Sequence, residues 1–421
     1  MAECLYIAKK NETMELENPF FTITDIPEEF FCDRKVETAK IISLLNNGSN
    51  VVLKAPRRIG KSSLIKHVFK QKVIVDRYNT LFVDIYGTKN AADFHSEFQN
   101  ALLSAPFARN SRIKRTFSSM VKSAYIELGD YDTLTGKVSF PKIGFSPSTL
   151  PKIPIKDLFG YLEETSRPNL IVFDEFQQIQ QYPERMAAIL RGYIQQMRNT
   201  RFIFSGSSRH MLTTMFQLSN QPFYKSAAPM DLDILSLDSY KEFCHEMFKY
   251  GNKNVDDAAV TFAYYLFLGE TYLLQEVMKE SYSRTASGGA CTKEIVLSSI
   301  EELLNRKESD YRDILNRLNN QKERNTLYCI AVEGIARGLT SSSIMKRYNL
   351  DNASSVQNAL ENLGEDKLGL IDKIAKGTFI VQDRLFELWI SKKTGMLETK
   401  YLDAENRFNR QREIISSVNL P

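Results

Sequence analysis

Short apolar runs alternate with amphipathic segments over the first half of the chain. The runs show no alternation of polar and apolar positions, which is typical of strands covered on both faces. The amphipathic segments repeat apolar residues at helical spacing. We expect strands at 51–53, 81–85, 170–173 and 202–204, a candidate fifth at 232–235, and helices from 62 onward, over 91–103 and over 186–197. This order predicts a mostly parallel sheet with helices on both faces.

Beyond position 238 the pattern becomes helical. The stretch AAVTFAYYLFLG is too short for a membrane span and predicts a buried helix. Residues 320–390 show helices followed by two short apolar stretches, LIDKI and TFIVQD, around Ala375-Lys376-Gly377. Helices followed by such a hairpin suggest a winged helix. We expect the charged residues 392–413 to form a frayed or partner-bound helix.

The composition is that of a soluble globular protein, with 43% hydrophobic and 25% charged residues. A net charge of +4 does not by itself argue for nucleic-acid binding. The five cysteines are far apart and form no CxxC pair, so neither a zinc site nor a disulfide framework is suggested. The N-terminus lacks the apolar core of a signal peptide, and no apolar run approaches a membrane span. We therefore expect a cytoplasmic protein with reduced thiols and no membrane partner.

The segment KAPRRIGKSSL, residues 54–64, joins the first expected strand to the first expected helix. It matches the Walker A pattern, with alanine where the first glycine usually stands. Converging backbone N–H groups and a helix N-terminus make such a loop a phosphate cradle. We expect Lys61 to reach the β and γ phosphates of ATP and Ser62 to bind Mg²⁺. The candidate nucleotide-binding residues are Ala55, Pro56, Arg57, Arg58, Ile59, Gly60, Lys61, Ser62 and Ser63.

The side chains inside this loop differ in what they contribute. Ala55 carries little bulk and is compatible with a negative φ, so it does not exclude phosphate binding. Gly60 allows the backbone to approach the phosphates closely. Arg57 and Arg58 offer planar guanidinium groups for phosphate, an adjacent subunit or a neighbouring acid. A local salt bridge explains both arginines at least as well, so neither is assigned to catalysis.

The segment LIVFDEFQQI, residues 170–179, places two acids directly after an apolar strand. The strand carries both carboxylates to the carboxyl edge of the sheet, beside the phosphate loop. We expect Asp174 to hold the Mg²⁺ shell and Glu175 to orient and deprotonate the attacking water. The alternative is a strand that ends in solvated acids, and the phosphate loop at this separation favours the catalytic interpretation.

The segment FIFSGSSRHM, residues 202–211, ends the fourth expected strand with polar residues. In a sheet of this class, a polar side chain there can lie between the two motifs and contact the γ-phosphate. Ser205 is the first candidate for this role and Ser207 the second. Serine and glycine also terminate strands without any further function, so the two explanations stay open.

With these motifs the chain resembles the archaeal-type ATPases, close to the AAA+ and STAND classes of P-loop NTPases, and especially their paralogues in gut Bacteroidetes. The resemblance covers nearly the whole chain and rests on NPF, FFCDR, APRRIGKSSL, FVDIYGTK, FDEFQQI, FIFSGSSRHM and PFYKS. It implies an ATP-binding domain, a helical lid and a winged helix, with ATP-driven switching or assembly. It also implies that the segment Phe31 to Arg34 lies near the adenine, which adds Phe31 and Arg34 to the nucleotide-binding candidates.

Together these features predict an α/β, P-loop NTPase (ASCE/AAA+-like) parallel sheet domain followed by a helical lid and a winged-helix domain. The proline- and glycine-rich stretch GKVSFPKIGFSPSTLPKIP indicates an insertion in the core at about 104–157. The expected parts are an N-terminal segment with a lead-in helix at 1–50, the ATPase core at 51–237, the lid at 238–318, the winged helix at 319–391 and a charged tail at 392–421.

Two positions depart from the pattern of the resembling family. Relatives often carry an arginine after a Pro-Leu-Tyr-Gly run, as a finger for a neighbour's γ-phosphate, whereas Lys225 stands here after Pro222-Phe223-Tyr224. Relatives also show a Gly-x-Pro turn that contacts the nucleotide from the lid. Here Gly269-Glu270-Thr271 has no proline. Activation by a neighbour and sensing by the lid therefore stay open.

The second helix of the expected winged helix, 353–363, has an outer face suited to base edges but poor in anchors for phosphate. The nearest basic residues are Lys346, Arg347, Lys367, Lys373 and Lys376. The outer face consists of Ser354, Ser355, Gln357, Asn358, Glu361 and Asn362. A packing or interaction role is the favoured interpretation, with DNA reading as the alternative.

The sequence therefore predicts a Mg²⁺-dependent ATPase in which Lys61, Glu175 and Ser205 act in catalysis. A slow nucleotide-sensing switch that binds ATP or ADP and rarely hydrolyses it is one alternative. A DNA-binding regulator or mobile-element factor is another. A nucleoside kinase fits less well, because of the paired acids and the single lid-like domain. The expected partners are ATP or ADP, further copies of the chain and an unidentified effector protein.

Overall fold

The computed structural model describes residues 18–108, 153–318, 320–364 and 367–418, so most of the expected insertion lies outside the described residues. The chain forms two compact units. The sheet unit consists of residues 24–28 and 34–233. The helical unit contains the described residues of 18–23, 29–33 and 234–418.

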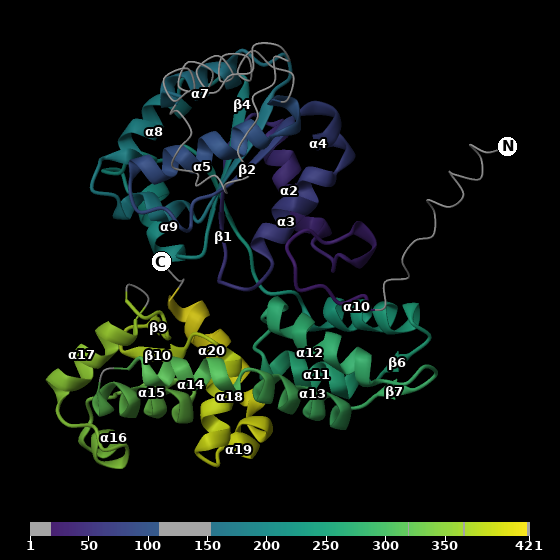
Figure 1. Cartoon of the computed structure of the whole chain (residues 1–421), viewed down its shortest axis with the longest axis vertical. Helices are drawn as coiled ribbons and strands as arrows, with labels where there is room; N and C mark the ends of the chain where they lie inside the picture. The colour runs from purple at the N-terminus through teal and green to yellow at the C-terminus, as the bar shows by residue number, and fades with distance from the viewer. Residues whose placement is uncertain (1–17, 109–152, 319, 365–366, 419–421) are drawn as a thin grey trace, which may run out of the picture. The chain divides into compact units, whose positions relative to one another are not determined.

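The sheet unit is built on a five-stranded sheet in which all neighbouring strands are parallel (Figure 1). The strands follow the order β2-β3-β4-β1-β5. They are β1 (Val51–Lys54), β2 (Asn79–Asp84), β3 (Asn169–Asp174), β4 (Thr200–Gly206) and β5 (Ala228–Asp231). The carboxyl ends of β1 and β3 therefore flank β4, and the architecture confirms the expected fold class.

The fifth strand forms at Ala228–Asp231 and not at 232–235, so that expectation was wrong. Its register pairs Val51 with Ala228 and Lys54 with Asp231. An edge strand tolerates the proline at position 229, which would disrupt a central strand. The apolar side chains that suggested a later strand, including Leu232, are buried after the strand has ended.

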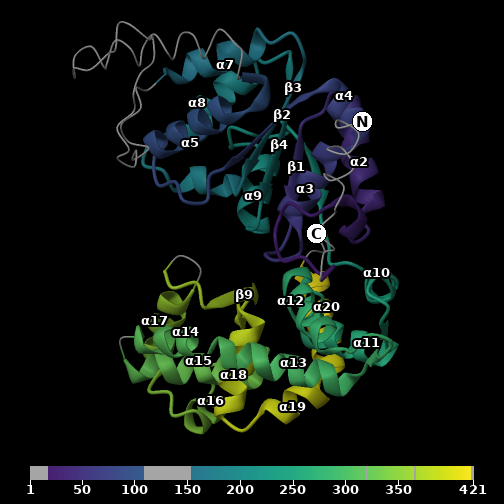
Figure 2. The same cartoon turned by 45° about the vertical axis from the view of Figure 1, so that its right-hand side comes forward.

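Helices cover both faces of this sheet. Figures 1 and 2 show α5, α7 and α8 on one face and α2, α3 and α4 on the other. The helices are α2 (Lys35–Asn46), α3 (Lys61–Lys70), α4 (Lys72–Arg77), α5 (Ala91–Ser104), α7 (Ile155–Glu163), α8 (Met186–Ile194) and α9 (Arg209–Gln217). Short 3-10 turns lie at η2 (Glu28–Phe30), η3 (Pro106–Ala108) and η5 (Phe176–Gln181). The three helices expected from periodicity in this region correspond to α3, α5 and α8.

An aromatic cluster fills the space behind the carboxyl ends of β3 and β4. Phe176, the first residue of η5, packs against Phe204 at 4.6 Å and Phe223 at 5.1 Å between ring centroids. Phe204 and Phe223 also contact each other, at 5.4 Å. All three rings are almost fully buried. Burial of an aromatic side chain stabilises by roughly 2 kcal/mol, so the strand ends and the turns after them are firmly anchored.

The first part of the helical unit surrounds α11, which confirms the buried helix expected from AAVTFAYYLFLG. After α11 the chain turns at Gly269, whose φ is 72°, and α12 starts at Thr271. Glycine is required there because an added Cβ would lie 2.7 Å from Ile234 Cδ1. The elements are α10 (Leu237–Tyr250), β6 (Asn254–Val255), α11 (Asp257–Leu266), α12 (Thr271–Arg284), β7 (Ala290–Cys291), α13 (Lys293–Arg306) and α14 (Glu308–Asn316).

The second part of the helical unit has the element order of a winged helix. Strand β8 lies between α15 and α16, and the hairpin of β9 and β10 follows α17. The three strands form a sheet of order β8-β10-β9, and Gly377, with a φ of 65°, lies in the turn of the hairpin. The elements are α15 (Gln321–Glu333), β8 (Ala336–Arg337), α16 (Ser342–Arg347), α17 (Ala353–Leu363), β9 (Ile371–Ala375), β10 (Thr378–Val381) and α18 (Arg384–Lys393).

The expected charged tail is an integral part of the helical unit. It forms α19 (Leu397–Leu402) and α20 (Ala404–Val418), and α20 packs against α11. The Phe408 ring lies 5.5 Å from that of Tyr264 and 5.2 Å from that of Tyr265. The expectation of a frayed or partner-bound helix is corrected, because the apolar face of α20 is covered within the same unit.

Three cations surround one fully buried carboxylate where α18, α19 and α20 meet. Glu387 is paired with Arg384 at 2.5 Å, with Lys400 at 3.3 Å and with both terminal nitrogens of Arg407. Arg384 also donates from Nε to the Leu266 carbonyl at 2.8 Å, at the end of α11. This cluster joins the winged helix and the tail to the first part of the helical unit.

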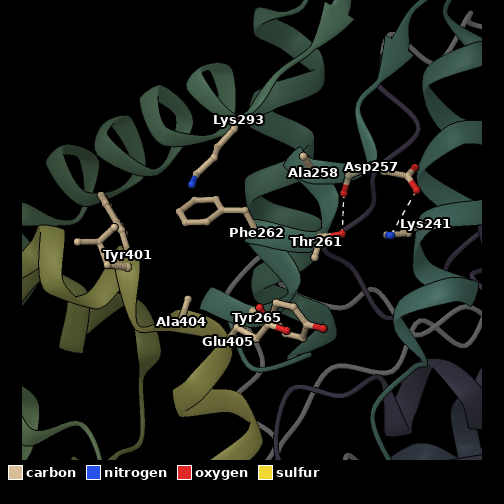
Figure 3. A pocket seen from close by; sticks show the side chains of 11 residues that line it. Lys241, Asp257, Ala258, Thr261, Phe262, Tyr265, Lys293, Tyr401, Ala404 and Glu405 are labelled. Atoms are coloured by element: carbon tan, nitrogen blue, oxygen red, sulfur yellow. Dashed lines mark hydrogen bonds and ion pairs between the residues drawn. The ribbon is translucent and has the colours of Figure 1, made fainter.

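The helical unit also carries a cleft of about 470 Å³. In Figure 3 the Lys293 side chain lies over the Phe262 ring, with Nζ 4.5 Å from the ring centroid. Lys241 is paired with Asp257 Oδ2 at 3.3 Å. Each of the two lysines thus already contacts a side chain of the same unit, and their ammonium groups do not together form an anion-binding site. Its lining consists of Lys241, Asp257, Ala258, Thr261, Phe262, Tyr265, Lys293, Tyr401, Leu402, Ala404 and Glu405.

Across the described ranges, no helix is both long enough and apolar enough to cross a membrane.

Candidate active site

The loop after β1 has the local geometry of a phosphate cradle. β1 ends at Lys54, and α3 starts at Lys61 with Gly60 as its N-cap residue. Gly60 has a φ of 86°, in the left-handed region that glycine adopts without strain. The first backbone N–H groups of a helix have no partner within the helix, so those of α3 face the loop and can bind an anion.

Ala55 fits its position in the loop without strain. Its side chain is fully buried, its φ is not positive, and its backbone N–H donates to the Gly206 carbonyl at 3.3 Å. The first residue of the loop is thus fastened to the end of β4, and a methyl group is accommodated there. The alanine that departs from the usual Walker A pattern leaves the loop intact.

The Arg34 side chain contacts the backbone of the phosphate loop. Its guanidinium is buried, donating to the Ile59 carbonyl at 3.3 Å and to Glu37 Oε1 at 2.6 Å. The resemblance implied a place near the adenine, and the structure places this side chain in contact with the phosphate loop itself. Phe31 lies in the helical unit. In the loop, Arg57 and Arg58 are half-buried, and Arg58 has a left-handed φ of 64°.

The structure brings the two predicted motifs into direct contact at the carboxyl edge of the sheet. Lys61 Nζ lies 2.9 Å from Asp174 Oδ1 and 2.7 Å from Glu175 Oε1. The Ser62 hydroxyl donates to Asp174 Oδ2 at 2.6 Å. Lys61 and Asp174 are buried, and Glu175 is half-buried. One cation thus bridges two acids beside the N-terminus of α3.

The electrostatics of this cluster favour charged acids. Burial raises the pKa of Asp174, but Lys61 and the Ser205 and Ser62 hydroxyls outweigh it and hold the pKa below its usual value. Burial likewise raises the pKa of Glu175, and Lys61, Gln177 and Ser207 together lower it. Both side chains are therefore carboxylates at neutral pH.

The two candidate serines of β4 take different positions. Ser205 is fully buried, and its hydroxyl donates to Asp174 Oδ1 at 2.6 Å. Ser207 lies beside the second acid, and its hydroxyl donates to Glu175 Oε2 at 2.7 Å. Ser205, within β4, thus contacts Asp174, and Ser207, directly after the end of β4, contacts Glu175.

Gln177 belongs to this site, although the sequence did not single it out. It is 4% exposed, and its Nε2 donates to Glu175 Oε2 at 2.5 Å. Glu175 itself has a left-handed backbone, with φ 56° and ψ 41°, an uncommon conformation for a non-glycine residue. The only sequence signal was the position of Gln177 two residues after the acids.

Asp84 is a third acid at the same edge. β2 lies next to β3, and its last residue, Asp84, is in register with Asp174. Partial burial and the negative charges of Asp174 and Glu175 raise the pKa of Asp84, against the backbone N–H of Tyr86. An acid at the end of a neighbouring parallel strand could have been predicted, because strand ends meet at one edge.

The site suits Mg²⁺ by the chemistry of its donors. The Ser62 hydroxyl and the Asp174 carboxylate, 2.6 Å apart, offer the hard oxygen ligands that Mg²⁺ prefers. No group of three or more His, Cys, Asp or Glu side chains in the described residues is arranged to hold a metal ion.

Family comparison agrees with this geometry. A family model described as "ATPase domain predominantly from Archaea" matches residues 31–277 of the 421-residue chain. The chain belongs to this family. A second model, described as "Probable winged helix domain", matches residues 309–392. The two matches confirm the resemblance to the archaeal-type ATPases and the expected C-terminal winged helix.

A search of solved structures finds chains similar to this archaeal-type ATPase. The Walker-type ATPase PABY2304 of Pyrococcus abyssi has a TM-score of 0.59 at 19% identity, covering 88% of this chain and 99% of that one. The Aeropyrum pernix ORC2 protein, in ADPNP-ADP complexes, has a TM-score of 0.47 at 13% identity, covering 87% and 95%. The Aeropyrum pernix ORC1 protein in complex with DNA has a TM-score of 0.49 at 13% identity, covering 91% and 98%. No curated protein matches the chain at a significant level.

Lys225 of the ATPase domain lies exposed on an anchored turn. Phe223 is buried in the aromatic cluster, and the Lys225 backbone N–H donates to the Phe216 carbonyl at 2.9 Å. The Lys225 ammonium lies 5.2 Å from the centroid of the Tyr224 ring. A cation is thus presented to solvent at the position where the resemblance implies an arginine.

The winged helix of this ATPase offers a smaller polar face than the sequence suggested. Asn362 is half-buried, donating to the buried Glu323 at 3.0 Å and accepting from Lys367 at 2.6 Å. Its amide stabilises the α15–α17 packing and does not form part of a free face. The exposed residues of the expected face are Ser354, Gln357, Asn358 and Glu361, with Ser355 half-buried.

Proposed function

We propose that the chain is a Mg²⁺-dependent ATPase that hydrolyses ATP to ADP and phosphate in the sheet unit. The observation that carries this proposal is the convergence of Lys61, Asp174 and Glu175 beside the N-terminus of α3, within 2.9 Å. Loop, cation and paired acids are the groups that phosphoryl transfer to water requires. The family to which the chain belongs supports the same activity.

Phosphate binding rests on the loop and on Lys61. The N–H groups at the start of α3 bind the phosphate oxygens, and the partial positive charge of the helix N-terminus adds to the attraction. The Lys61 ammonium exchanges its two carboxylate partners for the β and γ phosphates. Since phosphate oxygens take the place of carboxylate oxygens, the Lys61 ammonium has anionic partners both before and after ATP binds.

Metal binding rests on Ser62 and Asp174. When bound, Mg²⁺ neutralises charge that develops on the phosphate oxygens. The Ser62 hydroxyl and one Asp174 oxygen would hold it, while the Ser205 hydroxyl keeps the other Asp174 oxygen in place. Ser205 therefore orients the Asp174 carboxylate and does not need to contact the phosphate.

Proton transfer rests on Glu175. A carboxylate with one oxygen released by Lys61 is free to accept a proton from an attacking water. The water oxygen forms a bond to the γ-phosphorus, the bond between that phosphorus and the bridging oxygen breaks, and ADP leaves. Glu175 is half-buried and contacts Lys61 at the end of the loop, so its carboxylate is only partly exposed to solvent.

The test is phosphate release from Mg-ATP by the wild-type chain and by Glu175→Gln. We expect the wild type to turn over and Glu175→Gln to bind ATP while losing at least ~100-fold in turnover. Glu97→Gln is the matched control, because Glu97 is exposed on α5 and the change removes the same charge. If neither wild type nor control releases phosphate although both bind ATP, the chain is a nucleotide-sensing switch and the hydrolytic proposal fails.

Assembly on ATP is supported by the exposure of Lys225. A cation presented by a neighbouring copy would stabilise charge on the γ-phosphate, so the rate per chain should rise with protein concentration. We expect Lys225→Ala to flatten that rise and to leave ATP binding unchanged. A rate per chain independent of concentration in the wild type would contradict this part of the proposal.

DNA binding by the winged helix is the second candidate. The observation that favours it is the exposed position of Lys373 and Lys376 on the hairpin strand and turn. Phosphate contacts by these lysines predict a duplex affinity that falls steeply with salt. We expect the double variant Lys373→Ala, Lys376→Ala to show a weaker dependence of duplex affinity on salt concentration. Absence of duplex binding at low salt would remove this candidate and leave an unidentified effector protein as the partner.

A further inference from the structure

Glu175 is held from two independent sides. Lys61 holds Oε1 at 2.7 Å. On Oε2 three donors converge: Gln177 Nε2 at 2.5 Å, the Ser207 hydroxyl at 2.7 Å and the Ser207 backbone N–H at 3.3 Å. None of the three donors on Oε2 belongs to the phosphate loop. When phosphates draw Lys61 away, Oε1 becomes free while Oε2 stays bound.

The position of Gln177 depends on the absence of a side chain at Gly206. An added Cβ at Gly206 would lie 1.9 Å from Gln177 Oε1 and 3.1 Å from its Cδ. The φ of Gly206 is not in the left-handed region, so backbone conformation does not require glycine there. The close approach of the Gln177 amide, with Leu212 Cδ1 as a second neighbour at 3.0 Å, leaves no room for a Cβ unless these side chains move.

The amide of Gln177 has a defined orientation. The reverse orientation would place its oxygen 2.5 Å from a carboxylate oxygen, which is repulsive, so Nε2 faces Glu175. Oε1 is buried and has no hydrogen-bond partner in the described part of the chain. A buried amide with only its donor side satisfied is not explained by packing stability. Its position is explained by the carboxylate that it holds.

We propose that Gln177 and Ser207 are positioning residues that orient Glu175 for proton abstraction, and that Gly206 is needed to make room for Gln177. The inference rests on the proposed hydrolysis of ATP. In the step, the proton of the attacking water moves to Oε1, the oxygen that Lys61 vacates. Gln177 and Ser207 exchange no proton and hold Oε2 throughout.

The decisive variant is Gln177→Met, which keeps the volume of the side chain and removes the amide. We expect kcat to fall by about 10-fold or more while KM for ATP changes less than about 2-fold. Gln180→Met is the matched control, because Gln180 is exposed in the same turn, and it should match the wild type. An unchanged kcat in Gln177→Met would overturn the inference.

Gly206→Ala tests the same contact from the other strand and covers the case that Gln177→Met folds poorly. We expect Gly206→Ala to lower kcat with little change in KM for ATP, as Gln177→Met does. In a Gln177→Ala background the same change should cause no further loss, because no amide remains to be displaced. Losses that multiply in the double variant would show that Gly206 and Gln177 act separately, against the inference.

The wild type and Glu175→Gln are measured alongside these variants. If the wild type does not turn over, the proposed function fails and the positioning role falls with it. If the wild type turns over, Glu175→Gln does not, and both Gln177→Met and Gly206→Ala behave as wild type, only the positioning role fails. The two failures are thus separated by one set of assays.

Discussion

The Ser205 hydroxyl donates a hydrogen bond of 2.6 Å to Asp174 Oδ1, across the parallel strands β4 and β3. The two residues come directly after the register pair formed by Phe204 and Phe173. Ser205 is fully buried, so its hydroxyl is committed to the acid and not to solvent. The carboxylate that would hold the metal is thus fixed by a neighbouring strand.

Removing this bond should weaken metal binding. We expect Ser205→Ala to raise the Mg²⁺ concentration for half-maximal phosphate release by about 10-fold, since a hydrogen bond to a charged group contributes about 1.5–3 kcal/mol. The measurement is a Mg²⁺ titration of turnover at saturating ATP. Ser207→Ala serves for comparison, because Ser207 contacts Glu175 and should lower kcat without changing the Mg²⁺ requirement. The same requirement in Ser205→Ala and wild type would contradict the role of Ser205.

Lys61→Met should abolish ATP binding and destabilise the sheet unit at neutral pH. The change leaves the buried Asp174 and the half-buried Glu175 without their cation, which costs about 3 kcal/mol or more. In the wild type the pKa values of both acids are lowered, so their stabilisation is present above the unfolded values and is lost as the pH falls. In the variant, burial and repulsion raise these pKa values instead.

The difference in unfolding free energy between wild type and Lys61→Met should therefore shrink as the pH falls from 7 towards 4, roughly the unfolded carboxyl range. Urea unfolding followed by circular dichroism at several pH values measures it. Lys72→Met is the control, since Lys72 is exposed on α4. A difference that stays constant with pH would argue against the ion cluster.

Arg407→Met should strongly destabilise the helical unit. Arg407 pairs through two nitrogens with the fully buried Glu387, and removing it leaves that carboxylate without its two-nitrogen partner. We expect a loss of about 3–5 kcal/mol. Arg410→Met is the matched control on the same helix, because its pair with Asp403 is exposed and should contribute less than about 1 kcal/mol. Urea unfolding followed by the fluorescence of Trp389 measures both, and equal effects would contradict the assignment.

Trp389 should report the protonation of Glu308. Its indole N–H donates to Glu308 Oε2 at 2.8 Å, and Trp389 is the single tryptophan of the chain. Hydrogen bonds from Lys393 and Trp389 lower the pKa of Glu308 to about 2. We expect Trp389 fluorescence to change with a midpoint well below the usual glutamate value, as the pH falls from about 4.5 to 2.

The ionised Glu308 side chain stabilises the folded helical unit, and this contribution falls with decreasing pH, as it does for Asp174 and Glu175. It is complete above the unfolded pKa of about 4.3 and is lost as the pH falls towards the folded value. Glu308→Gln should remove the fluorescence transition, whereas Glu405→Gln, an exposed acid on α20, should leave it in place. A midpoint near the ordinary glutamate pKa in the wild type would count against the contact.

The sequence by itself determined the sheet, the phosphate loop and the acid pair. Short apolar runs without alternation that are separated by amphipathic helices indicate strands covered on both faces, and a Gly-Lys-Ser turn between strand and helix is typical of phosphate binding through local backbone geometry. Lys61, Ser62, Asp174 and Glu175 were therefore predictable, because each lies at a fixed offset from a strand end. The winged helix was predictable for the same reason, since its helices and hairpin are local patterns.

Only the tertiary structure decided how these residues are supported. The burial of Ser205 beneath Asp174 depends on the order of β3 and β4, which apolar runs do not encode. Gln177 reaches Glu175 because Gly206, 29 positions later in the chain, has no side chain. The tail looked solvated because α20 is highly charged, yet α11 covers its apolar face and Arg407 is neutralised by Glu387. Contacts between residues far apart in the chain decide burial, and burial decides which polar groups are free to act.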